Sequence, residues 1–265
     1  MRSAPLDLGR AREVAIEAAE AAGALLRSGE QEPLGIRPKG SAGDVVTDLD
    51  LAAEKLILER LRSCYPEHQI IAEESGVLGA EGACVWLVDP LDGTKEFINR
   101  NGEFTVNIAL IENGYPTLGV VLAPALSWLF AGARGIGAFL EENAQRRPIA
   151  CRATPAAGLT VVASRSHGDA EALEKFLAGR NVASQRNAGS SLKLCLIAAG
   201  ECDVYPRLGR TMEWDIAAGD AVLRAAGGMV TTLAGEPLVY GKPDFTNPHF
   251  AAWGLVQAAA STGAP

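Results

Sequence analysis

Two aspartates and a proline lie within one short segment, D-P-L-D-G-T at residues 89–94. The four residues before it form an apolar run with β-branched and aromatic members, which predicts a core strand that reaches the surface near Asp89. Pro90 ends such a strand and fixes a turn, so that Asp89 and Asp92 can converge and the Leu91 carbonyl stays free as a third oxygen ligand. Hard oxygen donors of this kind suit Mg²⁺.

The residues after this turn indicate a phosphate site beside the metal site. Residues 93–97 have the pattern of a helix start, where unpaired N–H groups and the positive end of the dipole favour a bound anion. Carboxylates for a metal and amides for a phosphate therefore lie a few residues apart. Taken alone, D-P-x-D-G is also ordinary turn chemistry, so other acids must decide between the two interpretations.

Further acids occur at the ends of predicted elements. Glu73 and Glu74 follow an apolar run at residues 68–72, as at the end of a strand. Asp215 opens a helical stretch, where an acid can simply be an N-cap, and Asp44 lies in a loop where it can be a solvated acid. Each acid has an ordinary structural explanation, but their joint occurrence favours a metal-dependent phosphate site.

This combination resembles the lithium-sensitive, Mg²⁺-dependent phosphatase superfamily of inositol monophosphatase and fructose-1,6-bisphosphatase. The resemblance covers nearly the whole chain and is carried by the acid pair at residues 73–74, by residues 89–94, and by W-D-x-A-A-G at residues 214–219. Within the superfamily, the chain resembles in particular the bacterial 3'(2'),5'-bisphosphate nucleotidases of the CysQ type. The segments behind that second resemblance are residues 95–97, 101–107, 164–167, 189–193, 205–209 and 247–250.

The resemblance implies an activity and a set of metal ligands. The implied reaction removes the 3'-phosphate of adenosine 3',5'-bisphosphate to give AMP and phosphate in sulfur assimilation, with 3'-phosphoadenylyl sulfate as a further substrate. Glu73, Asp89 and the Leu91 carbonyl would hold one Mg²⁺, and Asp89, Asp92 and Asp215 a second. Two cations that share a carboxylate can bind both the attacking and the leaving oxygen. Glu74, the other acid of the pair, would support the site or bind a weak third ion.

The remaining roles also follow from the resemblance. Thr94, paired with Asp44, would orient and deprotonate the attacking water, together with Glu73, and the amides of Gly93 and Thr94 would hold the phosphate. The second phosphate of a nucleotide bisphosphate needs cationic or hydroxyl donors away from the metals. The candidates for this role are His167, Ser190, Ser191, Lys193 and Arg207. Three of these positions have structural alternatives: a solvated helix lysine, a serine N-cap and a surface arginine.

Two other functions remain open. An inositol or fructose phosphatase would share the metal motif, although residues 95–97 and 189–193 disfavour it. A non-catalytic relative that binds phosphate or metal is disfavoured because every expected ligand is present. The nucleotidase and the inositol or fructose phosphatase would all act on small-molecule substrates.

Composition agrees with a folded enzyme. The chain has 265 residues, 48% of them hydrophobic, and a formal net charge of −8, which argues against binding of a nucleic acid polymer. No apolar run approaches the roughly 18 residues of a membrane span. We expect a cytoplasmic monomer or homodimer, with peripheral association with the inner membrane as an open alternative. The five cysteines lack C-x-x-C pairing, which indicates reduced thiols.

Periodicity predicts a mixed α/β (α+β) chain. Helices are expected at residues 7–28, 48–64, 169–178, 190–199 and 214–226. Strands are expected at residues 69–72, 84–88, 159–163, 202–205 and 229–233, with a hairpin of 105–112 and 117–122, two more strands within 127–140 and a surface crossing at 141–148. The resemblance implies a layered α-β-α-β-α sandwich with the metal site between an N-terminal subdomain (1–148) and a C-terminal subdomain (149–265).

Overall fold

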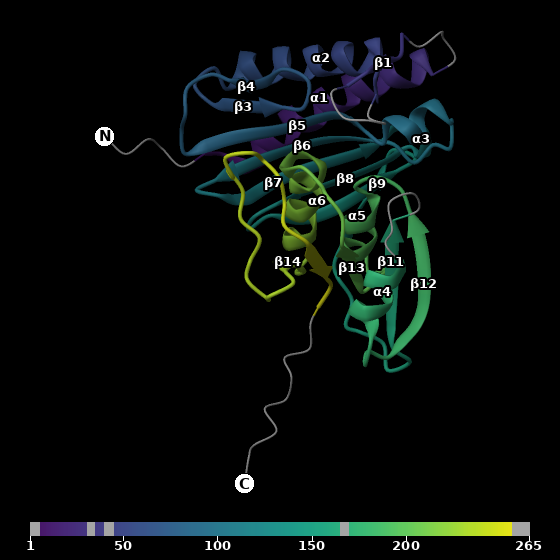
Figure 1. Cartoon of the computed structure of the whole chain (residues 1–265). Helices are drawn as coiled ribbons and strands as arrows, with labels where there is room; N and C mark the ends of the chain where they lie inside the picture. Colours follow the sequence, from purple (N-terminus) through teal and green to yellow (C-terminus); the bar gives the residue numbers. More distant parts are fainter. Residues whose placement is uncertain (1–5, 31–34, 40–44, 165–169, 256–265) are drawn as a thin grey trace.

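A computed structural model describes residues 6–30, 35–39, 45–164 and 170–255 of the chain (Figure 1). Two large sheets organise these residues. The first has eight strands in the order β10-β9-β8-β7-β6-β5-β3-β4. Its strands are β3 (Gln69–Ala72), β4 (Gly76–Leu78), β5 (Cys84–Asp92), β6 (Thr105–Glu112), β7 (Tyr115–Ala123), β8 (Trp128–Ala133), β9 (Gly137–Glu142) and β10 (Gln145–Ile149).

The centre of the first sheet is the predicted hairpin. Its connecting residues, Asn113 and Gly114, have φ values of 53° and 79°, as the two-residue turn of a hairpin requires. β6 and β7 pair in antiparallel register on either side of this turn. The strands are buried on both faces, so the sheet is covered on both sides.

Two long helices cover one face of the first sheet. They are α1 (Leu8–Gly29) and α2 (Asp48–Cys64), and they pack their apolar faces onto strands such as β5, β6 and β7. The Asp7 side chain caps α1 by accepting a hydrogen bond from the N–H of Arg10 at 3.0 Å. A capping box formed by Thr47 and Asp50 fixes the start of α2. A small two-stranded sheet, β1 (Arg37–Pro38) with β2 (Val45–Val46), precedes α2.

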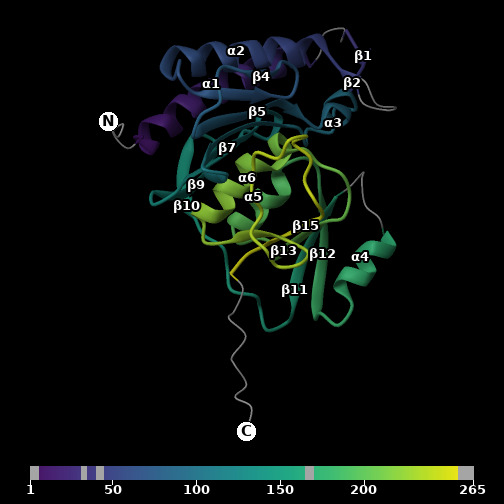
Figure 2. The ribbon, with the colours of Figure 1, turned by 60° about the vertical axis from the view of Figure 1, so that its left-hand side comes forward.

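The second sheet has five strands in the order β12-β11-β13-β15-β14. They are β11 (Leu159–Ser164), β12 (Val182–Ala188), β13 (Val204–Arg207), β14 (Met229–Thr232) and β15 (Phe250–Trp253). Between the two sheets lie α5 (Leu192–Ala198) and α6 (Glu213–Ala225), whose side chains join the inner faces of both sheets in one core. One of the two hydrophobic cores is therefore built around these two helices (Figure 2), and the other lies between the first sheet and the pair α1 and α2.

A last helix, α4 (Ala170–Leu177), lies outside the second sheet (Figure 2). Phe176 of α4 contacts Trp253 of β15. The residue before Trp253 in the strand, Ala252, belongs to the core between the two sheets, so α4 packs on the opposite face of the second sheet. The layers thus run α1–α2, first sheet, α5–α6, second sheet, α4, which confirms the predicted α-β-α-β-α sandwich. The first sheet ends at Ile149 and the second begins at Leu159. The division into two subdomains at residues 148 and 149 stays a prediction.

Two expectations about local structure were wrong. β5 does not end before Pro90 but continues to Asp92, because the ladder with β6 breaks only between Asp89 and Asp92 and then resumes. Asp89 is therefore buried at 1% exposure instead of emerging at the surface. The charged segment 141–148 is not a crossing either, because β10 pairs antiparallel with β9.

Other elements carried too weak a pattern to be predicted. β12 is exposed over most of its length, and β15 has only four residues. The helix start predicted at residues 93–97 is confirmed, because α3 (Thr94–Ile98) is a helix of five residues that begins there. A 3-10 turn at Pro124–Leu126 completes the described elements. Within the described part of the chain, no helix is both long and apolar enough to span a membrane.

α6 lies against the first sheet at glycine positions. A Cβ atom added to Gly119 of β7 would lie 2.1 Å from the carbonyl oxygen of Ala218 and 2.8 Å from the Cβ of Ala221. A Cβ at Gly132 of β8 would lie 2.9 Å from the Cα of Val222. The absence of side chains at these two positions allows the helix to approach the sheet closely, and this sets the place of residues at its N-terminus.

Gly119→Ala should therefore destabilise the protein. Because the added methyl group meets backbone atoms of α6, we expect a loss of roughly 1–3 kcal/mol in the free energy of unfolding, measured by urea denaturation. Gly82→Ala is the matched control, since a Cβ there has no neighbour within 4 Å. An unchanged urea midpoint for Gly119→Ala would show that α6 can move away from β7 at little cost.

Candidate active site

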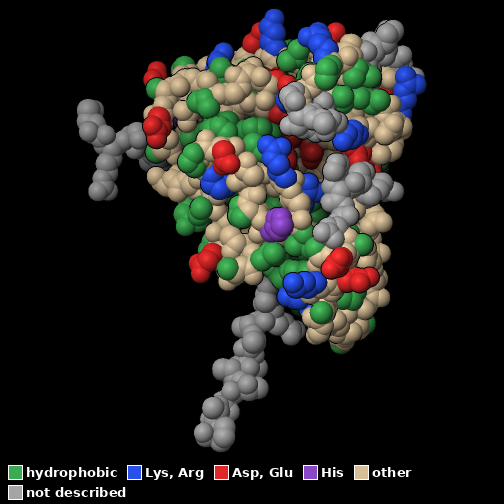
Figure 3. Space-filling view, in the orientation of Figure 1, with side chains coloured by type: hydrophobic (Ala, Val, Ile, Leu, Met, Phe, Trp, Pro, Cys, Tyr) green, Lys and Arg blue, Asp and Glu red, His purple; other side chains and the backbone are tan. Residues whose placement is uncertain are grey.

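A pocket of about 640 Å³ opens where the ends of β3, β5 and β13 meet the start of α6. Acidic side chains from both halves of the chain line it, together with basic ones. The acids are Glu73, Asp89, Asp92, Glu96 and Asp215, and the bases are Lys39, Lys95, Lys193, Arg207 and Arg210. Figure 3 shows acidic side chains recessed between Lys and Arg side chains on this face. Segments that are distant in the sequence thus meet at one cavity.

The two aspartates of β5 are held by the irregular end of the strand. Asp89 Oδ1 accepts a hydrogen bond from the N–H of Leu91 at 3.0 Å, whereas its buried Oδ2 has no hydrogen-bond partner among the residues that the structure describes. The Leu91 carbonyl is not free, as the sequence had suggested, because the Thr94 hydroxyl donates to it at 3.3 Å. A carbonyl oxygen has a second lone pair, so it can still accept another contact. Asp89 Oδ2 is the oxygen left open for a ligand.

Asp215 and Asp92 are linked through a serine. The hydroxyl of Ser191 lies 2.6 Å from the carbonyl oxygen of Asp215 and 3.2 Å from Asp92 Oδ2. Asp215 is the third residue of α6, and its Oδ2 accepts a hydrogen bond from the N–H of Met212 at 2.8 Å. Asp215 is therefore not the N-cap that the sequence allowed, because Met212 is the N-cap; the Asp215 carboxylate instead binds the N-cap amide, and Asp215 also lines the pocket. The Asp215 carboxylate therefore stabilises the start of α6 and also lines the cavity.

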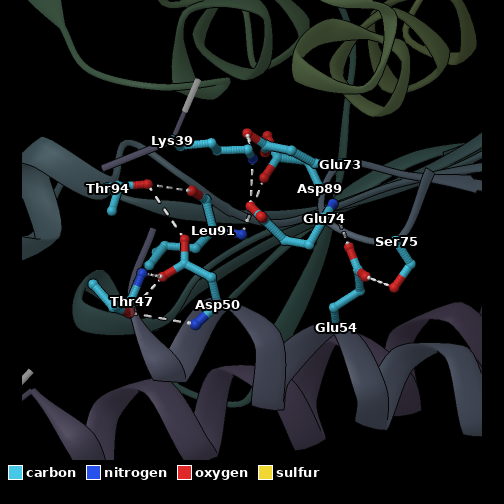
Figure 4. Close-up of polar contacts among 10 residues, drawn as sticks. All are labelled: Lys39, Thr47, Asp50, Glu54, Glu73, Glu74, Ser75, Asp89, Leu91 and Thr94. Carbon is cyan, nitrogen blue, oxygen red and sulfur yellow. Dashed lines mark hydrogen bonds and ion pairs between the residues drawn. The ribbon is translucent and has the colours of Figure 1, made fainter. Parts of the chain in front are cut away.

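Thr94 contacts a carboxylate that the sequence analysis did not choose. Its hydroxyl lies 3.4 Å from Asp50 Oδ1 (Figure 4). Asp50 is only 2% exposed and also accepts hydrogen bonds from the N–H and hydroxyl of Thr47. The predicted partner, Asp44, lies outside the described residues, so its role is untested. A signal for Asp50 was present in the sequence, because Thr47 and Asp50 have the spacing of a capping box.

A lysine binds the acid pair. Lys39 Nζ lies 2.7 Å from Glu73 Oε1 and 2.5 Å from Glu74 Oε1 (Figure 4). The two acids follow β3, and the N–H of Glu73 donates to the Val88 carbonyl on the neighbouring strand at 3.1 Å. Lys39 was not among the predicted site residues, and no motif around it distinguished it from a surface lysine. Its ammonium group partly neutralises the two carboxylates.

The carboxylates of Glu73, Asp89, Asp92 and Asp215 repel one another. Burial, then Glu73, and then Asp92 and Asp215 raise the pKa of Asp89 well above its usual value. Burial, followed by Asp92 and Glu73, does the same to the pKa of Asp215. Four carboxylates in one poorly solvated place are unfavourable unless a cation compensates their charge. Their oxygens are hard donors of the kind that Mg²⁺ prefers.

The donor set and the open Asp89 Oδ2 fit a divalent cation, but the side chains do not form a finished coordination shell. As these side chains stand, no three His, Cys, Asp or Glu residues in the described ranges are grouped so that they could hold an ion. The ammonium of Lys39 pairs with Glu73 Oε1 at 2.7 Å, so one oxygen of that carboxylate already has a cationic partner. Side-chain rotation would have to accompany cation binding. Metal ligation by Glu73, Asp89, Leu91, Asp92 and Asp215 therefore stays a prediction.

The phosphate-binding segment follows directly. Gly93 has a φ of 89°, a left-handed conformation that glycine adopts without strain, and it caps the short helix α3. The N–H of Phe97 donates to the Gly93 carbonyl at 2.9 Å, which closes the first turn of this helix. The amides of Gly93 and Thr94 thus belong to the first turn, where backbone N–H groups lack partners within the helix. Phosphate binding by them stays a prediction.

The predicted substrate residues fall into two groups. Ser190, Ser191 and Lys193 line the pocket, but their polar atoms have partners in the protein. The hydroxyl of Ser190 lies 2.7 Å from the Glu103 carbonyl, and Lys193 Nζ donates to the Ser190 carbonyl at 2.5 Å. Burial lowers the pKa of Lys193 to about 8. This lysine is neither solvated nor at the surface, and its contacts stabilise the turn before α5.

Arg207 has more capacity for a ligand. It lines the pocket, and one terminal nitrogen donates to the Arg210 carbonyl at 2.8 Å, while its buried Nε has no hydrogen-bond partner within the described ranges of the chain. Arg210, which the sequence analysis did not name, adds an exposed guanidinium to the same wall. His167 lies outside the described residues. Of the predicted donors whose contacts are described, Arg207 is thus the one with an open group in the pocket.

Comparison with known proteins agrees with this geometry. The model of the inositol monophosphatase family matches residues 7–262. The chain is 46% identical to the 3'(2'),5'-bisphosphate nucleotidase CysQ of Escherichia coli (strain K12) over 209 residues, which are 77% of this chain and 83% of that protein.

Solved structures give the same result. The structure of CysQ from Bacteroides thetaiotaomicron superposes with a TM-score of 0.79 at 35% identity and covers 94% of this chain and 99% of its own. An inositol monophosphatase from Anabaena (Nostoc) sp. PCC 7120 gives a TM-score of 0.75 at 32% identity, covering 94% of this chain and 92% of its own. A family match over almost the entire chain, a mixed α/β fold shared with these structures and a pocket lined by acids from both halves lead to one conclusion: the chain belongs to the inositol monophosphatase family.

Proposed function

We propose that the protein is a Mg²⁺-dependent phosphatase that hydrolyses the 3'-phosphate of adenosine 3',5'-bisphosphate to AMP and phosphate. The observation that carries the proposal is the composition of the pocket. Asp89, Asp92 and Asp215 line the pocket together with Thr94 and Arg207. Such a cavity offers a cation site beside a cationic group for a second phosphate. The names of the CysQ relatives support the same substrate.

Hydrolysis needs the transfer of one proton from water and the stabilisation of negative charge. Glu73, Asp89 and the Leu91 carbonyl would hold one Mg²⁺, and Asp89, Asp92 and Asp215 a second. When bound, the two cations supply positive charge to the phosphate and to the leaving oxygen.

The protein's own residues handle the proton and the phosphate. The Thr94 hydroxyl passes its proton to a carboxylate and takes one from the attacking water, whose oxygen then bonds to phosphorus as the bond to the 3'-oxygen breaks. The departing 3'-oxygen takes up a proton from solvent water and becomes the 3'-hydroxyl of AMP. Asp50, the carboxylate in contact with Thr94, is placed to accept that proton. The amides of Gly93 and Thr94 hold the phosphate in line. Asp44 remains a second candidate for the carboxylate.

The nucleotide end of the substrate would extend toward β13 and the start of α6. There Arg207 offers a charge-assisted bond to the second phosphate. The 3'-phosphoadenylyl sulfate precursor has the same 3'-phosphate and would be a further substrate. Sulfur assimilation in the cytoplasm is the proposed setting, with a monomer or homodimer as the active form.

An inositol monophosphatase is the second candidate. The likeness to the Anabaena enzyme favours it, because that structure covers nearly the same length of chain. Inositol 1-phosphate has no second phosphate, however, and would leave the guanidinium of Arg207 without an anionic partner. The two candidates therefore differ in their dependence on Arg207.

Binding of Mg²⁺ should stabilise the metal-free protein. Because the cation relieves repulsion among buried carboxylates, saturating MgCl₂ should raise the melting temperature by several degrees, as expected for a gain of about 2–4 kcal/mol. The measurement is a thermal melt after EDTA treatment, with and without MgCl₂. Asp92→Asn should show a smaller rise, and Glu59→Gln, at an exposed position on α2, should respond like the parent. Equal rises in the parent and Asp92→Asn would contradict the assignment of Asp92.

Activity itself is tested with three substrates. With saturating Mg²⁺, kcat/KM for adenosine 3',5'-bisphosphate should exceed the values for inositol 1-phosphate and fructose 1,6-bisphosphate, measured as phosphate release. Asp92→Asn should lower kcat by at least about 10²-fold, since a major electrostatic contribution at the phosphoryl group is lost. The fold should survive, as checked by circular dichroism. Hydrolysis by Asp92→Asn at the parent rate would be incompatible with the proposed site.

Specificity is tested through Arg207→Ala. Loss of a charge-assisted contact should lower kcat/KM for adenosine 3',5'-bisphosphate by about 10- to 100-fold, chiefly through KM. The value for inositol 1-phosphate should change little, because that substrate has no second phosphate. Arg186→Ala, at an exposed arginine of β12, is the matched control. A parallel loss for both substrates would assign Arg207 a general electrostatic role instead.

A further inference from the structure

Glu54 is a buried carboxylate on the side of α2 that faces the acid pair. It is only 2% exposed, and both of its oxygens accept hydrogen bonds. Oε2 accepts from the N–H of Glu74 at 2.9 Å, and Oε1 accepts from the hydroxyl of Ser75 at 2.5 Å. Figure 4 shows these contacts beside those of Lys39 with the acid pair. The partners of Glu54 are two consecutive residues of one turn.

A buried carboxylate is unfavourable unless hydrogen bonds replace its hydration. Glu54 has such bonds only because the backbone at Glu74 is turned toward α2. The same turn is tied on its other side by the N–H of Glu73, which donates to the Val88 carbonyl of β5. The turn is therefore fixed between a helix and a strand, and this fixes the direction in which the Glu73 side chain leaves the backbone.

Asp50 and Glu54 lie four residues apart, on the same face of α2. Asp50 contacts the Thr94 hydroxyl, and Glu54 holds the turn that carries Glu73. One helical face thus contacts two separate parts of the pocket wall. Because Asp50 and Glu54 belong to the same rigid helix, one of these carboxylates cannot move relative to the other without a change in α2.

We propose that Glu54 is a positioning residue of the site: by holding Glu74 and Ser75 it sets the orientation of Glu73 for cation binding. The inference rests on the proposed function, since it assumes that Glu73 is a ligand. Groups that orient ligands through hydrogen bonds typically change metal affinity by about 10- to 100-fold when they are lost. Glu54 itself touches neither substrate nor cation.

The first measurement needs no metal and no substrate. Hydrogen exchange of the Glu74 amide, followed by NMR in the metal-free protein, should be slow in the parent and at least about tenfold faster in Glu54→Leu, which removes both acceptors. Glu54→Gln should keep the amide protected, because its Oε1 can accept from Glu74 and its amide group can donate to Ser75. Glu59→Leu, the same change at an exposed position of α2, should exchange like the parent.

The second measurement is Mn²⁺ binding by calorimetry. Glu54→Leu should raise the dissociation constant by about tenfold or more, and Glu54→Gln should recover most of the affinity. Parent-like affinity of a folded Glu54→Leu would overturn the proposal, and so would equal losses in Leu and Gln, because charge and not hydrogen bonding would then matter. If Glu54→Leu does not fold, Ser75→Ala decides: a few-fold weaker affinity supports the proposal, and parent-like affinity overturns it.

The two measurements also separate this inference from the proposed function. A parent protein that binds no Mn²⁺ would argue against the proposed function. The exchange rate of the Glu74 amide would still show whether Glu54 fixes the turn. Slow exchange in Glu54→Leu, with Mn²⁺ binding intact, would refute the positioning role alone.

Discussion

Repulsion among buried carboxylates is the constraint on which the arrangement of the pocket depends. Asp89, Asp92 and Asp215 come from two distant segments and meet where water solvates them poorly, so that their pKa values are raised. A protein retains such a cluster only if the surrounding structure holds it together and a cation offsets its charge. Lys39 supplies part of that charge at the acid pair, but no lysine or arginine in the described part of the chain bonds to Asp89 Oδ2.

Packing of the elements around the pocket stabilises the positions of these acids. α6 approaches the first sheet over Gly119 and Gly132, and this close packing brings Asp215 to the end of β5. The hydroxyl of Ser191 then links Asp215 to Asp92 across the two halves of the chain. Apolar burial on both sides of α6 therefore opposes the electrostatic repulsion at its N-terminus.

The sequence predicted most of the fold because its strongest patterns are local. Apolar periodicity placed α1, α2 and the central hairpin to within a few residues, and the acid motifs located the pocket. The errors arose where tertiary contacts override local rules. Pro90 lies inside β5, because the ladder with β6 is already broken between Asp89 and Asp92. The Thr94–Asp50 contact was not predicted because it joins residues far apart in the sequence, whereas the predicted partner, Asp44, lies outside the described residues and stays a prediction.

The residues of the pocket come from both halves of the chain. The first sheet and α2 carry the acid pair, Asp89 and the Thr94–Asp50 contact, and α6 carries Asp215; in the proposed function these residues would act on the cation, the water and the transferred phosphate. Arg207 belongs to β13 of the second sheet, and it would meet the part of a substrate that does not react. Under the proposed function, the choice between the two candidate substrates would depend on Arg207, whereas the carboxylates that repel one another would serve either substrate. The Ser191 hydroxyl contacts Asp92 of the first half and the Asp215 carbonyl of the second, so a shift of either half would disturb the carboxylates of the pocket.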